Sequence, residues 1–491
     1  MTRTFPRSLV VTGGALGVIL ILVVGGMRLG VGFATAAVLG LSLMIPLVRI
    51  ALRHERLLVG LLCAVAVIMP GLSYSLAWPA SLQYAVDVMA IVFFAIALAR
   101  RSKRGLRIRL DRPIIAFCLL LVVLVLVTQS FSLAGIQSLW SLILGPLVVI
   151  AVLNSELHAA DVRSLVRWLF VLCLFQLAVE LVQRFVLQIE SVDRIGGTLG
   201  RAGTTQIGVL MACFWVAVIA YVTAMWRWRA GVLLLVPLLA MGLAEAKAGY
   251  LLAAIGTVFV AGAWLIRRQY KRALVAGAAV VLPILIVYLL LRYFPQLVFG
   301  SKSAGEYWLR ALANPQSQMD YLQSYSAGGQ AQRLASLTVS WGAISSKGAV
   351  PFGLGLGALN SSPYLSPGAA ITPWLADTLA WTPSAGRMLL ESGLLGISSL
   401  CLLFFAQCRH GLTLLKMGGE PHSFLGAACI GIVPVFVLGG FYTTAWTFRA
   451  LSIPFWVFVA LLRLQEKSQP KPSPRRAGAR ARRASRSMAR Y

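Results

Sequence analysis

The sequence predicts an all-α polytopic membrane protein, with about 12–14 transmembrane helices and one large loop outside the membrane. Hydrophobic residues make up 59% of the 491 residues and charged residues only 12%, whereas soluble globular domains are about half apolar and about a quarter charged. Apolar runs of about 20 residues, the length of a helix that crosses a bilayer, recur along most of the chain. This pattern excludes an ordinary soluble domain and a disordered chain.

Apolar runs bounded by charges or turn residues divide the chain into regions. The expected spans lie near residues 9–27, 29–48, 57–78, 84–99, 114–133, 136–153, 168–187, 206–225, 231–246, 248–266, 273–294, 388–406, 423–441 and 445–462. Eleven of them fall within 1–294 and three within 387–464, on either side of a large loop at 295–386. The tail at 465–491 is rich in Arg, Lys, Ser and Pro, has no apolar periodicity, and is predicted to be disordered.

Basic residues set the predicted orientation. The formal net charge is +29, from 44 Lys and Arg against 15 Asp and Glu. If the N-terminus is cytoplasmic, 32 of the 44 basic residues lie in alternate loops and in the tail, which is the positive-inside pattern. Both termini are therefore expected in the cytoplasm. Nucleic acid is not an expected partner, and the tail is interpreted as an inside anchor, with binding to anionic membrane lipid as the alternative.

The large loop, Pro295–Gly386, has 92 residues, too many for a simple connection, and is predicted to be functional. Apolar residues at spacings of 3, 4 and 3 predict an amphipathic helix within it, at Leu334, Leu337, Trp341 and Ile344. Lys347-Gly348 is expected to close this helix. The run Pro351–Gly357 lacks the strand and helix of a dinucleotide-binding fingerprint, so it is interpreted as a tight chain reversal in a packed loop.

Two segments on the predicted outer side carry features of an anion site. In Arg194–Gly203, glycines would let backbone N–H groups converge into an anion nest, and arginines would bind phosphate in bidentate fashion. The alternative is a glycine-rich turn with exposed arginines. Glu245 and Lys247 lie at an outer turn, where each charge costs roughly 3 kcal/mol on insertion, so they should face a cavity or each other.

Further charged residues lie near predicted helix ends. Arg333 begins the loop helix, where a cation is unfavourable unless an anion binds there too. Arg387 and Glu391 are four residues apart, and so are Glu180 and Arg184, which predicts an ion pair on one helix face in each case. The sequence has no Cys-x-x-Cys pair, and its four histidines fall on the predicted cytoplasmic side. Neither a metal site nor a cofactor is therefore expected.

Taken in order, these segments resemble the O-antigen ligase and polymerase superfamily of bacterial membrane glycosyltransferases over roughly residues 190–400. Arg194–Met211 is similar to the family's Arg-x-x-Gly-Thr segment. Leu243–Tyr250 resembles a segment in which the family usually has arginine at the place of Lys247. Arg333–Gly357 is similar to the family's Arg, then Trp, then Gly-x-Gly-x-Gly loop, and Leu390–Gly396 to the Glu-x-Gly-x-x-Gly opening of the next helix.

The resemblance implies a GT-C-like fold in the bacterial inner membrane, with the active site facing the periplasm. It also implies inverting, metal-independent transfer from a polyprenyl-pyrophosphate-linked glycan donor to a glycan acceptor, with a chain-length regulator as a further partner. Ligases of the family usually carry a His-Asn pair shortly before the glutamate. Here Thr382-Pro383-Ser384 stands in that region, which favours the polymerase branch, acting on O-antigen or exopolysaccharide.

The resemblance and the chemistry together give a candidate site, because a departing pyrophosphate needs cations and an acceptor hydroxyl needs a base. The predicted pyrophosphate-binding residues are Arg194, Arg201, Lys247, Arg333 and Arg387. The candidate bases are Glu391 and Asp377, followed by Asp320. Three alternatives stay open: an O-antigen ligase to lipid A core, a protein O-oligosaccharyltransferase, and a lipid-linked oligosaccharide flippase, for which Asp87 would be the main deep charge.

Overall fold

The computed structural model describes residues 54–75, 85–189, 195–200, 203–293, 316, 333–359, 378–379 and 382–467. The first two predicted spans, most of the large loop and the basic tail from 468 lie outside these residues. The chain forms two units, Met1–Leu58 and Val59–Tyr491. The contacts described below all lie within the second unit.

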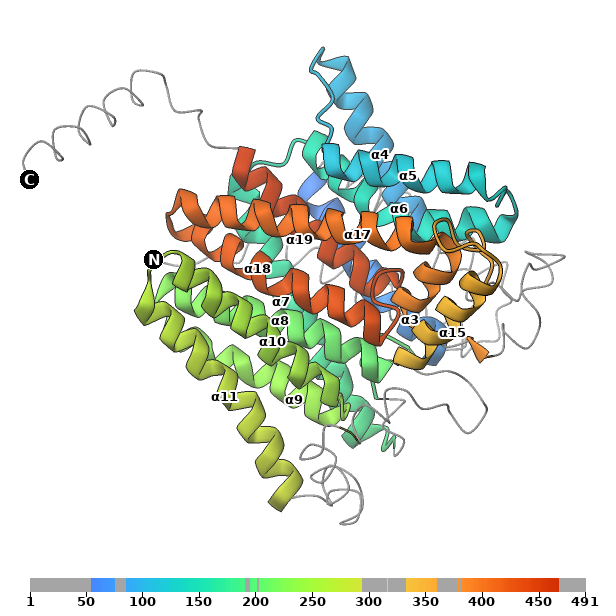
Figure 1. Cartoon of the computed structure of the whole chain (residues 1–491). Helices are drawn as coiled ribbons and strands as arrows, with labels where there is room; N and C mark the ends of the chain where they lie inside the picture. Colours follow the sequence, from blue (N-terminus) through green and yellow to red (C-terminus); the bar gives the residue numbers. More distant parts are fainter. Residues whose placement is uncertain are drawn as a thin grey trace, which may run out of the picture. The chain divides into compact units, whose positions relative to one another are not determined.

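Every regular element of the described residues is helical (Figure 1). The main helices are α3 Glu55–Ser75, α4 Ala85–Lys103, α5 Arg112–Val127, α6 Leu133–Asn154, α7 Ala159–Leu181, α8 Gly203–Met225, α9 Leu235–Leu243, α10 Lys247–Ile266, α11 Tyr270–Tyr293, α15 Arg333–Ser346, α17 Ser384–Met417, α18 Glu420–Tyr442 and α19 Arg449–Lys467. A π-helical turn, η2 Val182–Val186, extends α7, and a 3-10 helix, η4 Trp228–Leu234, precedes α9. A helix is present at each predicted span from 57–78 onward, so these predictions of helical structure are confirmed.

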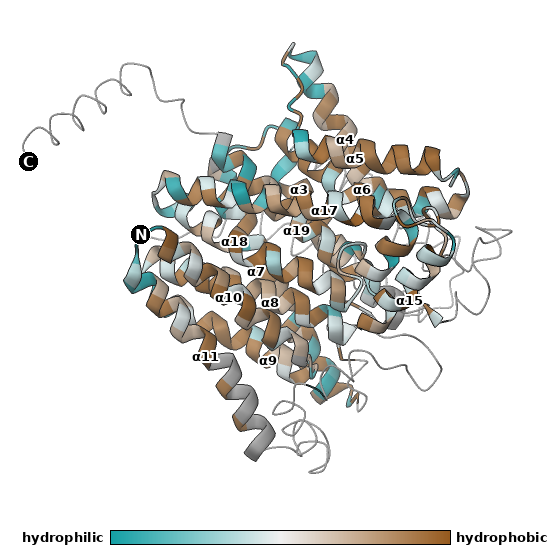
Figure 2. Cartoon of the chain, in the orientation of Figure 1, coloured by the Kyte–Doolittle hydropathy of each residue, from teal (hydrophilic) through white to brown (hydrophobic). Residues whose placement is uncertain are grey.

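Within the described part of the chain, six helices are long and apolar enough to cross a membrane. They are Leu133–Asn154, Ala160–Val186, Gly203–Met225, Ala248–Ile266, Ser384–Met417 and Glu420–Tyr442. Large apolar side chains also cover exposed helix faces, among them Leu119 of α5, Val258 of α10 and Phe405 of α17. Figure 2 shows hydrophobic residues along the helices and hydrophilic residues gathered toward helix ends and connections. Water-soluble proteins rarely expose so much apolar surface, whereas lipid tails cover it without cost.

Small residues let the helices of the core approach one another closely. A methyl group at Gly256 of α10 would lie 2.5 Å from the Val216 side chain of α8 and 3.1 Å from the carbonyl oxygen of Gly431 in α18. Such glycine contacts are typical of helix packing in membranes. Buried indole groups find partners as well, because Trp215 Nε1 donates to Thr257 Oγ1 at 3.0 Å.

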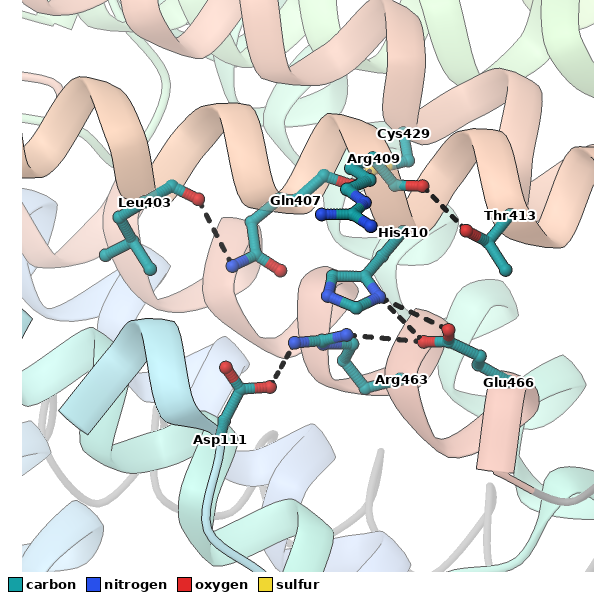
Figure 3. A network of polar contacts seen from close by, with 9 residues as sticks. All are labelled: Asp111, Leu403, Gln407, Arg409, His410, Thr413, Cys429, Arg463 and Glu466. Atoms are coloured by element: carbon teal, nitrogen blue, oxygen red, sulfur yellow. Dashed lines mark hydrogen bonds and ion pairs between the residues drawn. The ribbon is translucent and has the colours of Figure 1, made fainter. Parts of the chain in front are cut away.

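A polar network joins α5, α17 and α19 near the C-terminal ends of α17 and α19 (Figure 3). Arg463 pairs with Asp111, the N-cap residue of α5, and donates to Glu466 at 3.3 Å. Glu466 also lies 3.0 Å from Nδ1 of His410. Burial alone would raise the pKa of the Glu466 carboxyl, but the hydrogen bonds and charges of His410 and Arg463 outweigh burial and lower it.

Candidate functional site

The turn that follows α18 brings together the N-terminal ends of three helices. Thr443 accepts a hydrogen bond from the backbone N–H of Ser384, the first residue of α17, at 3.0 Å. The Thr443 hydroxyl lies 3.3 Å from that of Thr205 in the first turn of α8. Arg333, the first residue of α15, donates from Nη2 to the Tyr442 hydroxyl at 3.0 Å. Segments from widely separated parts of the sequence therefore meet at one end of the bundle.

The start of α10 joins the same place through α8. A methyl group at Gly249 would lie 2.8 Å from the Cα of Gly208, so the two helices touch backbone to backbone. Lys247, the first residue of α10, precedes this contact by two residues; its side chain lies outside the described part of the structure. The N-termini of α8, α10, α15 and α17 thus converge, and each carries a partial positive charge that attracts anions.

Arg333 has two contacts with Tyr442. Besides the hydrogen bond to the hydroxyl, the centre of its guanidinium lies 4.5 Å from the centroid of the ring. Arg333 has an unusual backbone φ of 27° at the entrance to α15. The ring and the hydroxyl of Tyr442 together orient the guanidinium of Arg333.

The loop helix is present where the sequence predicts it, and of its predicted apolar face Ile344 is buried and Leu337 packs against the same apolar cluster, whereas Trp341 does not. The helix ends at Ser346 and is followed by Gly348 at φ 63°. Trp341, expected on the buried face, is 45% exposed, whereas Ser336 and Ser340 are fully buried. The physical reason is close packing against α17, where a methyl group at Gly386 would lie 2.8 Å from Ser336 Oγ. Only small side chains fit at such a contact.

The glycine segment before α8 is a packed turn, and the prediction of an anion nest is wrong for its described residues, 195–200. Gln183 Oε1 accepts hydrogen bonds from the backbone N–H groups of Gly196 and Gly197, at 3.3 and 3.0 Å. Gln176 Oε1 accepts one from the N–H of Thr198 at 2.8 Å. Amide groups that a substrate anion would need are therefore used by α7.

Some predicted site residues fall outside the described part of the chain. They are Arg194, Arg201, Asp320 and Asp377. In the sequence, Arg201 comes two residues before Gly203, the first residue of α8.

The predicted ion pair between Glu180 and Arg184 is not formed. Glu180 is buried, like the two glutamines that bind the glycine turn. Its side chain is fully buried, and neither carboxylate oxygen has a hydrogen-bond partner among the described residues. Arg184 Nη1 donates instead to the carbonyl of Ile189 at 3.4 Å. The π-helical turn η2 begins just after Glu180 and changes the helical register, so Arg184 no longer follows it on one face.

The predicted pair of Arg387 and Glu391 is confirmed as a contact. Arg387 Nε donates to Glu391 Oε1 at 3.1 Å, and Nη2 donates to Ser138 Oγ of α6 at 3.0 Å. The Glu391 side chain is 3% exposed, whereas that of Arg387 is 37% exposed. No pattern in the sequence indicates Ser138, because a single serine in an apolar run has no periodicity to mark it.

Asp87 is paired with a residue that the sequence did not indicate. Arg449 at the start of α19 donates to both carboxylate oxygens, Nε to Oδ1 at 2.5 Å and Nη2 to Oδ2 at 2.6 Å. The side chains are only 17% and 7% exposed for Arg449 and Asp87. This bidentate pair ties α4 to α19, and it neutralises the deep charge that the flippase alternative would use.

An apolar groove runs along the helices and is lined by side chains of α7, α8, α18 and α19, with Val67 from α3. The carbonyl of Val67 accepts a hydrogen bond from the Thr198 hydroxyl at 2.7 Å. One residue of the groove lining therefore contacts the glycine turn that precedes α8.

No family model matches the chain, and no curated protein matches it either. Among the described residues, no group of three or more His, Cys, Asp or Glu side chains is placed to hold a metal ion.

Proposed function

We propose that the protein is a membrane glycosyltransferase that polymerises lipid-pyrophosphate-linked oligosaccharide units, as an O-antigen or exopolysaccharide polymerase on the periplasmic face of the bacterial inner membrane. The observation that carries this proposal is the convergence of the N-termini of α8, α10, α15 and α17. The starts of α8, α10 and α15 belong to sequence segments that resemble the glycosyltransferase superfamily, and the fourth such segment, Leu390–Gly396, lies inside α17. Helix N-termini and cations together suit a doubly charged leaving group.

The proposed reaction is an inverting displacement. The acceptor hydroxyl oxygen attacks the anomeric carbon from the side opposite the pyrophosphate, and a carboxylate accepts the hydroxyl proton. The bond from the anomeric carbon to the phosphate oxygen breaks, and its electron pair leaves with the pyrophosphate. Arg201, Lys247 and Arg333 would stabilise the charge that develops on that oxygen. Glu391 is the candidate base that the structure describes.

The apolar groove fits the lipid part of such a donor. It is lined by hydrophobic side chains of α7 and α8, and its lining residue Val67 accepts a hydrogen bond from the glycine turn that leads into α8. A polyprenyl chain lying there would place its pyrophosphate near the helix N-termini. This arrangement supports a lipid-linked donor over a water-soluble nucleotide sugar.

The alternatives differ in the acceptor or in the class of protein. An O-antigen ligase or a protein O-oligosaccharyltransferase would use the same cations with lipid A core or protein as acceptor. A flippase would need functional charges within the membrane, and the bidentate pairing of Asp87 with Arg449 disfavours that role for Asp87.

Alanine substitutions at Arg201, Lys247 and Arg333 test the proposal. Each removes a group that stabilises the leaving group, which typically costs roughly 3 kcal/mol, or about a hundredfold in rate. Lys247→Arg should be milder because it keeps the charge. The matched control is Arg229→Ala, an exposed arginine after the opposite end of α8, which should be nearly silent.

The assay is polymer formation in membranes with variant protein levels matched by immunoblot. Near-normal product from both Arg201→Ala and Arg333→Ala would refute the proposed site. Surface glycans of a deletion strain separate the branches: lost chain-length laddering indicates a polymerase, and free polymer not attached to core indicates a ligase.

A further inference from the structure

Helix α17 is broken beside Glu391. Gly393 has φ 62° and ψ −161° inside the helix, a backbone conformation that is essentially restricted to glycine. The break separates residues 384–392 from residues 394–417. Irregular backbone at this depth in a membrane protein is tolerated only where other groups satisfy its hydrogen bonds, and such breaks often form substrate sites.

A segment of the large loop supplies those hydrogen bonds. Residues 350–357, here called the strap, run against the break and donate two backbone N–H groups to it. Leu354 N donates to the carbonyl of Leu390 at 2.7 Å, and Gly355 N donates to the carbonyl of Glu391 at 3.1 Å. The strap therefore binds the main chain of the candidate base directly.

The strap also satisfies the far side of the break. The N–H groups of Leu394 and Leu395 donate to the carbonyls of Val350 and Pro351 at 3.0 and 3.1 Å. Four backbone hydrogen bonds between the loop and the helix thus replace the helical hydrogen bonds that the break removes. This arrangement fixes the two halves of α17 through the strap rather than through each other.

The contact is too close for any side chain at Gly353. This residue has φ 74°, and a methyl group on it would lie 2.6 Å from backbone atoms of Glu391, Ser392 and Gly393. The strap therefore lies directly on the backbone at Glu391, whose side chain is held from the other side by Arg387.

The strap is continuous with α15 at its other end. Ile344 of α15 and Leu390 of α17 are fully buried in one apolar cluster, against which Val350 and Leu354 of the strap pack. Because α15 begins at Arg333, a short rigid path connects the Arg333 side of the candidate site to Glu391.

We propose that the strap, residues 350–357, is a positioning element that holds Glu391 at the break in α17 and ties it to the helix that carries Arg333. The inference rests on the proposed function. In this arrangement the strap does not touch the reacting atoms. It keeps the Glu391 carboxylate and the Arg333 guanidinium at a fixed separation. The base can then face the acceptor hydroxyl while the cation faces the pyrophosphate of the sugar donor.

The test compares two glycine substitutions. Gly353→Ala adds a methyl group against the Glu391 backbone, whereas Gly348→Ala adds one at a similar φ of 63° with nothing within 4 Å. Both variants carry the strain of alanine at positive φ, so only the close approach differs. In a steady-state assay with a lipid-linked donor, Gly353→Ala should lower kcat by about a hundredfold with little change in KM, as expected for a displaced catalytic group. Gly348→Ala should keep kcat within about threefold of the wild type.

A double-variant cycle shows whether the strap acts through Glu391. If it does, adding Gly353→Ala to Glu391→Gln should lower kcat no further, because the positioned group is already gone. Multiplicative losses would overturn the inference. If Gly353→Ala yields no folded protein by gel filtration and thermal melting, Gly355→Ala replaces it in the same cycle. The nearest atoms to its methyl group are the Ser130 hydroxyl at 2.2 Å and the Thr128 side chain at 3.4 Å.

The outcomes separate the inference from the function on which it depends. Full activity in Gly353→Ala together with loss in Glu391→Gln refutes the strap alone. Full activity in Glu391→Gln refutes the role of Glu391, and the strap inference with it. The alanine variants of Arg201 and Arg333 remain an independent test of the glycosyltransferase proposal.

Discussion

The buried pair of Asp87 and Arg449 allows a quantitative test of what holds α4 to α19. The pair has two charge-assisted hydrogen bonds of 2.5 and 2.6 Å and little exposure to solvent. Removing one partner of a buried pair leaves the other charge uncompensated, at a cost of about 3–5 kcal/mol. Asp87→Asn and Arg449→Gln should therefore each lower the free energy of unfolding by about 3 kcal/mol or more.

The double variant should be more stable than the sum of the two single losses in free energy of unfolding predicts. Asp87→Asn with Arg449→Gln removes both charges together, so neither is left buried alone, and replacing both ends of such a pair is often close to neutral. The expected coupling energy is at least about 2 kcal/mol, which is well above the error for independent sites. Unfolding by SDS titration in mixed micelles measures the free energies, and product formation is measured on the same preparations.

Two results would contradict this reasoning. Additive losses in the double variant would show that the two side chains do not pair in the folded protein. A stable but inactive double variant would show that the charge on Asp87 or Arg449 is functional, which would revive the flippase alternative. An active double variant with restored stability would fit a structural pair in an enzyme.

Three further predictions concern other parts of the chain. Glu180→Gln should keep or raise thermal stability, because a buried carboxylate without a partner among the described residues costs stability; a clear drop in melting temperature would show that a cation binds it. Because the pKa of Glu466 is lowered, its ionised form should contribute stability that is complete above the ordinary pKa of about 4.3 and is lost as the pH falls through the lower folded pKa. The gap in melting temperature between wild type and Glu466→Gln should therefore be present at about pH 6 and close in stronger acid. A gap that does not depend on pH would contradict this prediction. Truncation after Lys467 should leave product formation within about threefold, because a tail without apolar periodicity adds no core contact; complete loss at equal protein level would contradict that.

The features predicted well from the sequence are those that local spacing determines. Apolar runs place the helices because each span must bury its own backbone polar groups. The contact between Arg387 and Glu391 follows from a spacing of four residues in a regular helix. The same rule failed for Glu180 and Arg184 because a π-helical turn lies between them. A spacing rule assumes regular geometry, and a single apolar stretch shows no sign of where that geometry changes.

The features missed depend on residues far apart in the chain. Arg449 lies 362 residues after Asp87, so no pattern in the sequence links them. The anion nest was predicted from the glycines and arginines of one segment, but Gln176 and Gln183, which precede it in the chain, occupy the amide groups of Gly196, Gly197 and Thr198. Hydrophobicity predicted a face of α15 that includes Trp341, whereas the close approach of Gly386 on α17 selects small side chains such as Ser336 at the contact. In each case a tertiary partner decides the role of a local motif.

Contacts between helix ends explain why the candidate site lies at one end of the bundle. The first residues of α8 and α17 both contact Thr443 at the end of α18, and the first turn of α10 lies against α8 at Gly208, so these three N-termini share one end. The same end receives α19, whose first residue, Arg449, is neutralised by Asp87 of α4. Arg387 at the start of α17 is likewise paired, with Glu391. Arg333 at the start of α15 donates to the hydroxyl of Tyr442 and lies over its ring. Because cations at helix N-termini are unfavourable without a neighbouring anion, carboxylates of the chain balance the charge at α17 and α19. In the proposed function, a substrate pyrophosphate would add such an anion beside the starts of α8, α10 and α15, and so would lower the electrostatic energy of the helix ends that meet there.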